Sequence, residues 1–154
     1  MFDSNYQVFN QSFLKLALNF NSFSNTATAS TSSSMYFFRS VGFSHPQTLI
    51  HNNKNEVIGT IHYNLLSFNA QLVMQSGEKF NWSFQNNWMS AWSLNNQKDK
   101  QVLYHAKSGK GRIDASVDDE LIVGCGIFIR EYYVRILFIL FLVLFIPIMG
   151  KGLI

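Results

Sequence analysis

Residues 118–154 have the sequence DDELIVGCGIFIREYYVRILFILFLVLFIPIMGKGLI, and this stretch decides the fold. The apolar run from Ile136 to Met149 is shorter than the roughly 20 residues that usually cross a bilayer core. The stretch that begins at Leu121 is long enough, but three charged residues interrupt it. The segment is therefore predicted to enter a membrane, to fill a protein core, or to fill a core with its first part and enter a membrane with its second part.

The start of this segment has the features of a helix N-terminus. Ser116, with Asp119 three residues later, predicts a capping box, and the acidic residues that follow suit the positive end of a helix dipole. Residues 121–129 leave no polar face, so such a helix must be surrounded by protein or lipid. Pro147 and Gly150 suggest where it ends.

Upstream of this helix, residues 35–117 have a sequence pattern typical of antiparallel strands. Short segments rich in β-branched and aromatic residues alternate with turn sequences such as HNNKNE, SGEK and NNQKDK. In KFNWSFQ, the residues Phe80, Trp82 and Phe84 share one face, as a half-buried strand requires. The predicted fold class is mainly β: an antiparallel β-barrel or meander with a hydrophobic C-terminal helix.

The N-terminal part divides the chain further. Residues 1–34 are predicted to hold one or more strands and, over residues 19–34, a flexible loop rich in Ser, Thr and Asn. The four expected segments are this N-terminal part, a β domain at 35–117, an apolar core helix at 118–133 and a hydrophobic tail at 134–154.

The composition limits the partners. Only 14% of the 154 residues are charged, and the net charge of +3 comes from scattered Lys and Arg without a basic run. The sequence therefore gives no reason to expect nucleic acid as a partner. Cys125 is the one cysteine, so no disulfide can form within the chain, which suits a reducing compartment but equally suits any buried thiol.

No residue pattern predicts catalysis, a cofactor or a metal ion. The histidines lack metal-ligand spacing, and no nucleophile elbow or P-loop is present. Trp82, Trp88 and Trp92 suit either an aromatic platform for a ligand or ordinary packing in a β core. The chain is therefore predicted to be non-enzymatic, without cofactor or metal.

Three stretches give the chain a resemblance to a known family: EVIGTIHY at 56–63, SGEKFNWSF at 76–84 and GRIDASVDDELIVGCGIFIREYY at 111–133. The pattern resembles the tubby C-terminal-like superfamily, which includes the LURP-one-related proteins and the phospholipid scramblases. The resemblance covers residues 35–133 and implies strands that close into a barrel with a helix through its middle.

The resemblance suggests that the helix begins inside the barrel and leaves it. Such an interior would shelter Leu121 to Tyr133, whereas the family pattern does not require the further apolar tail. The expected core-helix residues are Leu121, Ile122, Cys125, Phe128 and Ile129. The expected membrane-anchor residues are Tyr132, Tyr133, Arg135, Ile136, Phe138, Phe141 and Phe145.

We expect a charged collar at Arg130, Glu131 and Arg135 to separate the two parts, with Tyr132 and Tyr133 at the lipid interface and the domain on the cytoplasmic side. The rival arrangement is a tilted helix that spans the membrane over its whole length.

These features predict a non-enzymatic, membrane-associated β domain. Its expected role is lipid contact, membrane tethering or scaffolding. Two alternatives stay open. One is a soluble, cytoplasmic barrel that binds a small apolar ligand or a partner protein, and the other is scramblase-like lipid movement. Self-association is not decided by the sequence.

Overall fold

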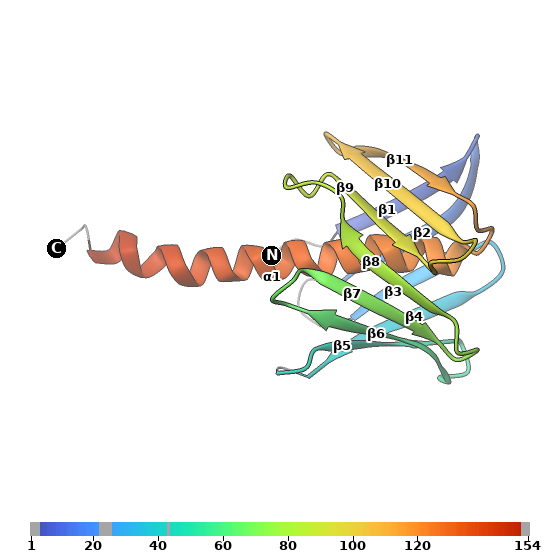
Figure 1. Ribbon diagram of the computed structural model, residues 1–154, viewed down its shortest axis with the longest axis horizontal. Coiled ribbons are helices and arrows are strands. Elements are labelled where there is room, and N and C mark those ends of the chain that lie inside the picture. The colour runs from blue at the N-terminus through green and yellow to red at the C-terminus, as the bar shows by residue number, and fades with distance from the viewer. Residues whose placement is uncertain (1–3, 22–25, 43, 152–154) are drawn as a thin grey trace.

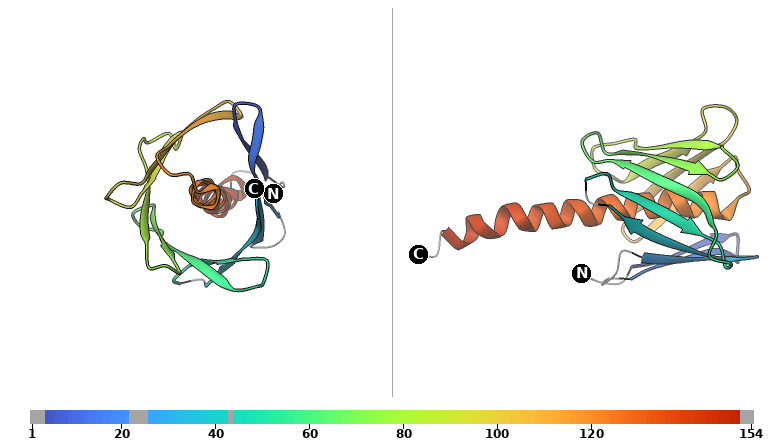
Figure 2. Two further views of the ribbon diagram at one scale, coloured as in Figure 1. Left: turned by 90° about the vertical axis from the view of Figure 1, so that its right-hand side faces the viewer. Right: turned by 90° about the horizontal axis from the view of Figure 1, so that it is seen from below.

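The computed structural model shows one antiparallel sheet curled around one long helix (Figures 1 and 2). It describes residues 4–21, 26–42 and 44–151, with side chains of the helix up to Ile146. The strands are β1 (Ser4–Asn10), β2 (Phe13–Phe20), β3 (Thr26–Thr31), β4 (Met35–Val41), β5 (Gln47–His51), β6 (Val57–Asn64), β7 (Asn69–Met74), β8 (Lys79–Phe84), β9 (Ala91–Asn95), β10 (Gln101–Lys107) and β11 (Lys110–Ala115), and the helix is α1 (Glu120–Lys151).

Each strand pairs with its neighbours in the chain, so the sheet is a meander in the order β1 to β11. The prediction of a mainly β, antiparallel fold with a C-terminal helix is confirmed. Among the described residues β1 and β11 share no ladder, so the closed barrel that the resemblance implied is wrong. The sheet is open along the seam between these two edges.

Alternation along the strands builds the core. In β8, Phe80 and Trp82 are 1% exposed, while Asn81 between them is half-buried on the other face. The inward faces of the strands surround α1, and the helix packs most closely on β2, β3 and β9. The curled sheet would enclose an empty space if its interior were unoccupied, and the apolar helix fills that space.

The flexible loop expected at residues 19–34 is wrong for Thr26–Thr31, which form β3. Here β-branched Thr alternates with small residues, and Ala27 and Ala29 face inward with exposures of 3% and 0%. Because α1 packs against this strand, small side chains suffice to fill the space. Residues 22–25 of the expected loop lie outside the described residues.

The helix starts with a different cap from the predicted one. Asp119 is the N-cap: its Oδ1 accepts hydrogen bonds from the backbone N–H groups of Leu121 and Ile122, at 2.9 and 3.3 Å. The Ser116 hydroxyl instead bonds the backbone of Gln101, so the predicted capping box is wrong. Glu120 lies in the first turn, where the helix dipole favours its charge.

Residues 120–133 of the expected core helix and residues 134–151 of the expected tail belong to one continuous helix. It continues through Pro147 and ends at Lys151, one residue after Gly150, so the proline does not end the helix. Figure 1 shows its first half inside the sheet and its second half projecting from one end.

Candidate functional site

The buried half of α1 holds the five expected core-helix residues. Their exposed fractions are 5% or less: Leu121, Ile122, Cys125, Phe128 and Ile129. Phe128 stacks between Phe20 and Phe38, with ring centroids 5.3 and 4.5 Å apart. Burial raises the pKa of the Cys125 thiol, so this cysteine is a packing residue in its neutral form.

The expected interface role of Tyr133 is wrong, because this residue is fully buried. Its hydroxyl donates to the carbonyl oxygens of Asn64 and Asn69, which flank the β6–β7 loop. Tyr132 is half-buried and stacks on Tyr63, with centroids 3.8 Å apart. Both tyrosines therefore fasten the helix to the sheet at the point where it leaves.

The expected charged collar is in part a buried polar cluster. Glu131 is 6% exposed, and its carboxylate accepts hydrogen bonds from Ser4 Oγ at 2.8 Å, Tyr6 Oη at 2.6 Å and Arg135 Nε at 2.9 Å. Arg135 also donates to the Asn21 carbonyl oxygen. Arg135 thus neutralises Glu131 at the rim of the sheet, rather than standing free as an anchor.

This cluster ties the edge strand to the helix. Burial opposes ionisation of Glu131, but the hydrogen bonds from Tyr6, Arg135 and Ser4 outweigh it, so the pKa of this carboxyl lies below its ordinary value. Burial and the Glu131 carboxylate raise the pKa of Tyr6 to about 12, which keeps its hydroxyl a donor. The contacts hold β1 in place, although its described residues form no ladder with β11.

Replacing Glu131 with Gln is expected to lower the free energy of unfolding by about 1–3 kcal/mol at neutral pH. Since the folded pKa is depressed, the stabilisation is present above the ordinary value of 4.5 and is lost as pH falls through the folded pKa. Chemical unfolding of the detergent-solubilised chain between pH 3 and 7 measures this. The gap between wild type and E131Q should close below about pH 4.5.

The control is D118N, which removes the same charge from an exposed position. A gap between wild type and E131Q that stays constant down to pH 3 would show that the carboxylate is not a charged member of the folded cluster.

Beyond the rim, α1 exposes an unbroken apolar surface. We call Phe138–Ile146 the projecting segment. Each of its nine side chains is a large hydrophobic, with an exposed fraction between 36% and 63%. Nine consecutive residues make two and a half turns, so the apolar surface faces every direction around the helix. Of the expected anchor residues, Phe138, Phe141 and Phe145 lie in this segment, and Ile136 is half-buried just before it.

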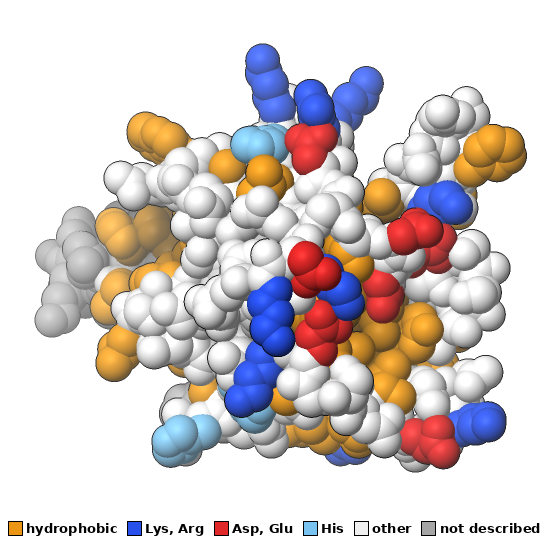
Figure 3. Space-filling model, turned by 45° about the vertical axis from the view of Figure 1, so that its right-hand side comes forward, with side chains coloured by type: hydrophobic (Ala, Val, Ile, Leu, Met, Phe, Trp, Pro, Cys, Tyr) orange, Lys and Arg blue, Asp and Glu red, His pale blue; other side chains and the backbone are white. Residues whose placement is uncertain are grey.

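The two ends of the sheet differ in charge. The loops at 52–56, 75–78, 96–100 and 116–119 lie at the end where α1 begins, and we call this the acidic end. It carries Glu56, Glu78, Asp99, Asp118 and Asp119, with Glu120 beside them. Figure 3 brings this end forward and shows its acidic side chains among lysines.

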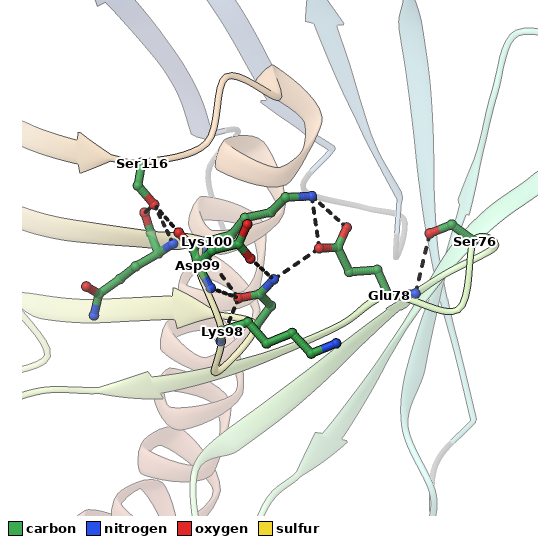
Figure 4. A network of polar contacts seen from close by, with 8 residues as sticks. Ser76, Glu78, Lys98, Asp99, Lys100 and Ser116 are labelled. Atoms are coloured by element: carbon green, nitrogen blue, oxygen red, sulfur yellow. Dashed lines mark hydrogen bonds and ion pairs between the residues drawn. The ribbon is translucent and has the colours of Figure 1, made fainter.

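Many of these charges are compensated. At the acidic end, Lys100 Nζ lies 2.9 Å from Glu78 Oε1, and Asn96 donates to both Glu78 and Asp99 (Figure 4). The Asn96 side-chain oxygen also accepts from three backbone N–H groups of its own turn. The Lys100 hydrogen bond is the main cause that lowers the pKa of Glu78. This network joins the β7–β8 and β9–β10 turns and serves the fold.

The opposite end, which we call the exit rim, comprises the loops at 65–68 and 85–90 and the hairpin turn at 107–110. Two hydrogen bonds fix the position of the 85–90 loop, one to the helix and one to the strand that leads into the 107–110 turn. Arg130 Nε donates to the Met89 carbonyl oxygen at 3.2 Å, and the Ala106 N–H donates to the Ser90 carbonyl oxygen at 2.8 Å. The rim therefore lies beside the helix at the end of the sheet from which the helix projects (Figure 1).

The exit rim carries exposed apolar side chains and cations that pair with no carboxylate in the described part of the chain. Leu66 is 95% exposed and Trp88 is 87% exposed. Lys107 and Lys110 are exposed, and within the described residues neither they nor Arg130 form a salt bridge. Of the three tryptophans, Trp82 and Trp92 are core residues, and only Trp88 has the exposure that an interfacial contact needs.

The described residues offer little for chemistry. No group of three metal-ligating side chains gathers among them. Two pockets lie on the described part of the chain, one at the β1–β2 hairpin and one over β3 and β4, and neither is lined by residues of α1. Over the same part of the chain, no helix combines the length and the apolar character needed to cross a membrane.

Comparison with protein-family models, curated proteins and solved structures finds no match. The fold defines the class: a mainly β protein with one curled meander and a helix through it. Membership of the tubby C-terminal-like superfamily stays a prediction.

Proposed function

We propose that the protein is a non-enzymatic, membrane-associated β domain whose projecting segment is embedded in lipid, and that it tethers or scaffolds at the membrane surface. One observation carries this proposal: nine consecutive large hydrophobic side chains are exposed on all sides of the helix. Soluble monomers rarely expose an apolar patch of this size, so something covers it.

Lipid suits this surface better than a protein partner does. A partner that docks on one face would leave the other faces in water, whereas lipid surrounds a helix completely. The projecting segment also lacks the small residues Gly, Ala and Ser, which let two helices approach closely in a membrane.

The geometry favours insertion from one side. The projecting segment is roughly 14 Å long at 1.5 Å per residue, and the helix backbone from Phe138 to Lys151 is roughly 21 Å long, against a bilayer core of about 30 Å. Within the described residues the helix therefore reaches into lipid without crossing it. The tubby-like resemblance, with its lipid-related members, agrees with this proposal.

Flotation tests the proposal. The chain is synthesised in a cell-free system with phosphatidylcholine vesicles, and the vesicles are floated through a density gradient. Wild type should float. Substitution of Phe138, Phe141 and Phe145 by Ser should weaken partitioning about a thousandfold, since each loses roughly 1.5 kcal/mol of apolar burial.

The matched control replaces three exposed phenylalanines outside the segment: Phe9, Phe13 and Phe37, whose exposures are 55%, 73% and 41%. This control should float like wild type. A wild-type chain that remains at the bottom of the gradient as a discrete oligomer would contradict the proposal and would show that copies of the chain cover the helix.

A further inference from the structure

The charged side chains of this small domain are unevenly distributed. Outside the buried Glu131 cluster, the described acidic residues lie at the acidic end, except for Asp114, which pairs with Arg112 at 2.7 Å. The exit rim instead holds Lys107, Lys110 and Arg130. The end that faces the proposed membrane is therefore the positive end.

Contacts hold these cations on one side of the emerging helix. The Arg130 guanidinium lies 4.8 Å from the Trp92 ring centroid and donates to Met89, in the loop that carries Trp88. Backbone hydrogen bonding joins Ala106 to Ser90, so the hairpin with Lys107 and Lys110 starts beside the same loop. In that hairpin Lys107 opposes Lys110, and the tight turn between them has positive φ at Ser108 and Gly109.

Two like charges directly opposed on a hairpin destabilise it, and here no described carboxylate offsets them. A bound anion would offset these two positive charges. Trp88 adds an amphipathic ring of the kind that prefers the headgroup region of a membrane. Arg130 supplies a planar fork of donors that suits a phosphate group.

From this arrangement we propose that the exit rim binds the headgroups of anionic phospholipids through Lys107, Lys110 and Arg130, with Trp88 at the level of the headgroups. The inference rests on the proposed function, because the projecting segment brings the rim to the lipid surface. It adds that the domain docks against the bilayer in one orientation and prefers an anionic leaflet.

The test compares flotation of the full chain on phosphatidylcholine vesicles with flotation on vesicles that also contain phosphatidylserine, at low and at high salt. Wild type should bind the anionic vesicles more tightly, and salt should remove the difference. The double variant K107Q/K110Q should lose most of that preference, by a factor of the order of ten, and should bind neutral vesicles like wild type.

The matched control is K54Q/K98Q, which removes two exposed lysines from the acidic end and so changes the net charge equally. It should keep the full preference for anionic vesicles. W88S should weaken binding to both kinds of vesicle, while its circular dichroism spectrum stays that of wild type.

The outcomes separate the two proposals. Equal loss of preference in K107Q/K110Q and K54Q/K98Q would overturn the inference, since net charge alone would then explain binding. No preference in wild type would overturn it too, and the proposed function would stand if the chain still floats. Failure of wild type to float on either kind of vesicle would overturn both.

Discussion

Replacing Gly126 with Ala is expected to destabilise the domain by about 1–3 kcal/mol, because α1 and β10 leave no room for a methyl group there. A Cβ on Gly126 would overlap the Tyr104 ring, whose Cε2 would lie 2.7 Å away. Tyr104 cannot swing aside: it is 1% exposed, stacks on Trp92 and donates to the Val123 carbonyl oxygen at 2.9 Å.

Gly124 provides the control, two residues earlier on the same helix. There an added Cβ would meet only the tips of the Leu16 side chain, the nearest at 3.1 Å. Because Ala gains up to about 1 kcal/mol of helix propensity over Gly at both sites, G124A should be neutral or slightly stabilising. Equal unfolding midpoints for the two variants in chemical denaturation would contradict the packing of Tyr104 against the helix.

Ending the chain after Leu137 is expected to leave a folded domain that no longer binds neutral lipid vesicles. Every side chain from Phe138 to Ile146 is exposed, so their removal takes away little of the packing of the sheet. Residues 1–137 should give a β-rich circular dichroism spectrum and a cooperative unfolding transition, and should stay at the bottom of a flotation gradient with neutral vesicles.

A shorter chain, ending after Ile129, is the comparison. It lacks Glu131, which fastens β1, and Tyr133, which bonds the β6–β7 loop and stacks on Trp82 with centroids 5.4 Å apart. We expect it to be unfolded or aggregated, since several buried groups lose their partners at once. Unfolding of residues 1–137 as well would mean that the distal helix is integral to the core.

Much of the fold follows from local sequence. The strands between residues 57 and 115 alternate in a two-residue period and are separated by clear turn sequences, and they lie within the β domain predicted at 35–117. β3 was missed because Ala and Thr carry little hydrophobic signal, and only the neighbouring helix makes their burial sufficient.

The candidate site was harder to predict. The apolar run itself identifies Phe138, Phe141 and Phe145, but the boundary between sheet and tail depends on tertiary contacts. Tyr133 and Glu131 are held by residues 64 to 127 positions away in the chain, and no local pattern reveals such partners. Trp88 looks like a core residue by type. Its polar flanks in the sequence QNNWMS were the available signal that it sits in an exposed loop.

Depth-dependent fluorescence quenching tests the central claim most directly. A polarity-sensitive dye is placed on F141C in the full chain, because the native Cys125 is fully buried and does not compete for the label. Vesicles carry lipids brominated either near the headgroup or deep in the acyl chain, and the same dye on K98C at the acidic end serves as the control. The account predicts blue-shifted emission at position 141 that deep bromines quench, and no quenching at position 98. Emission at position 141 that neither lipid quenches would show that the projecting segment is not in the membrane.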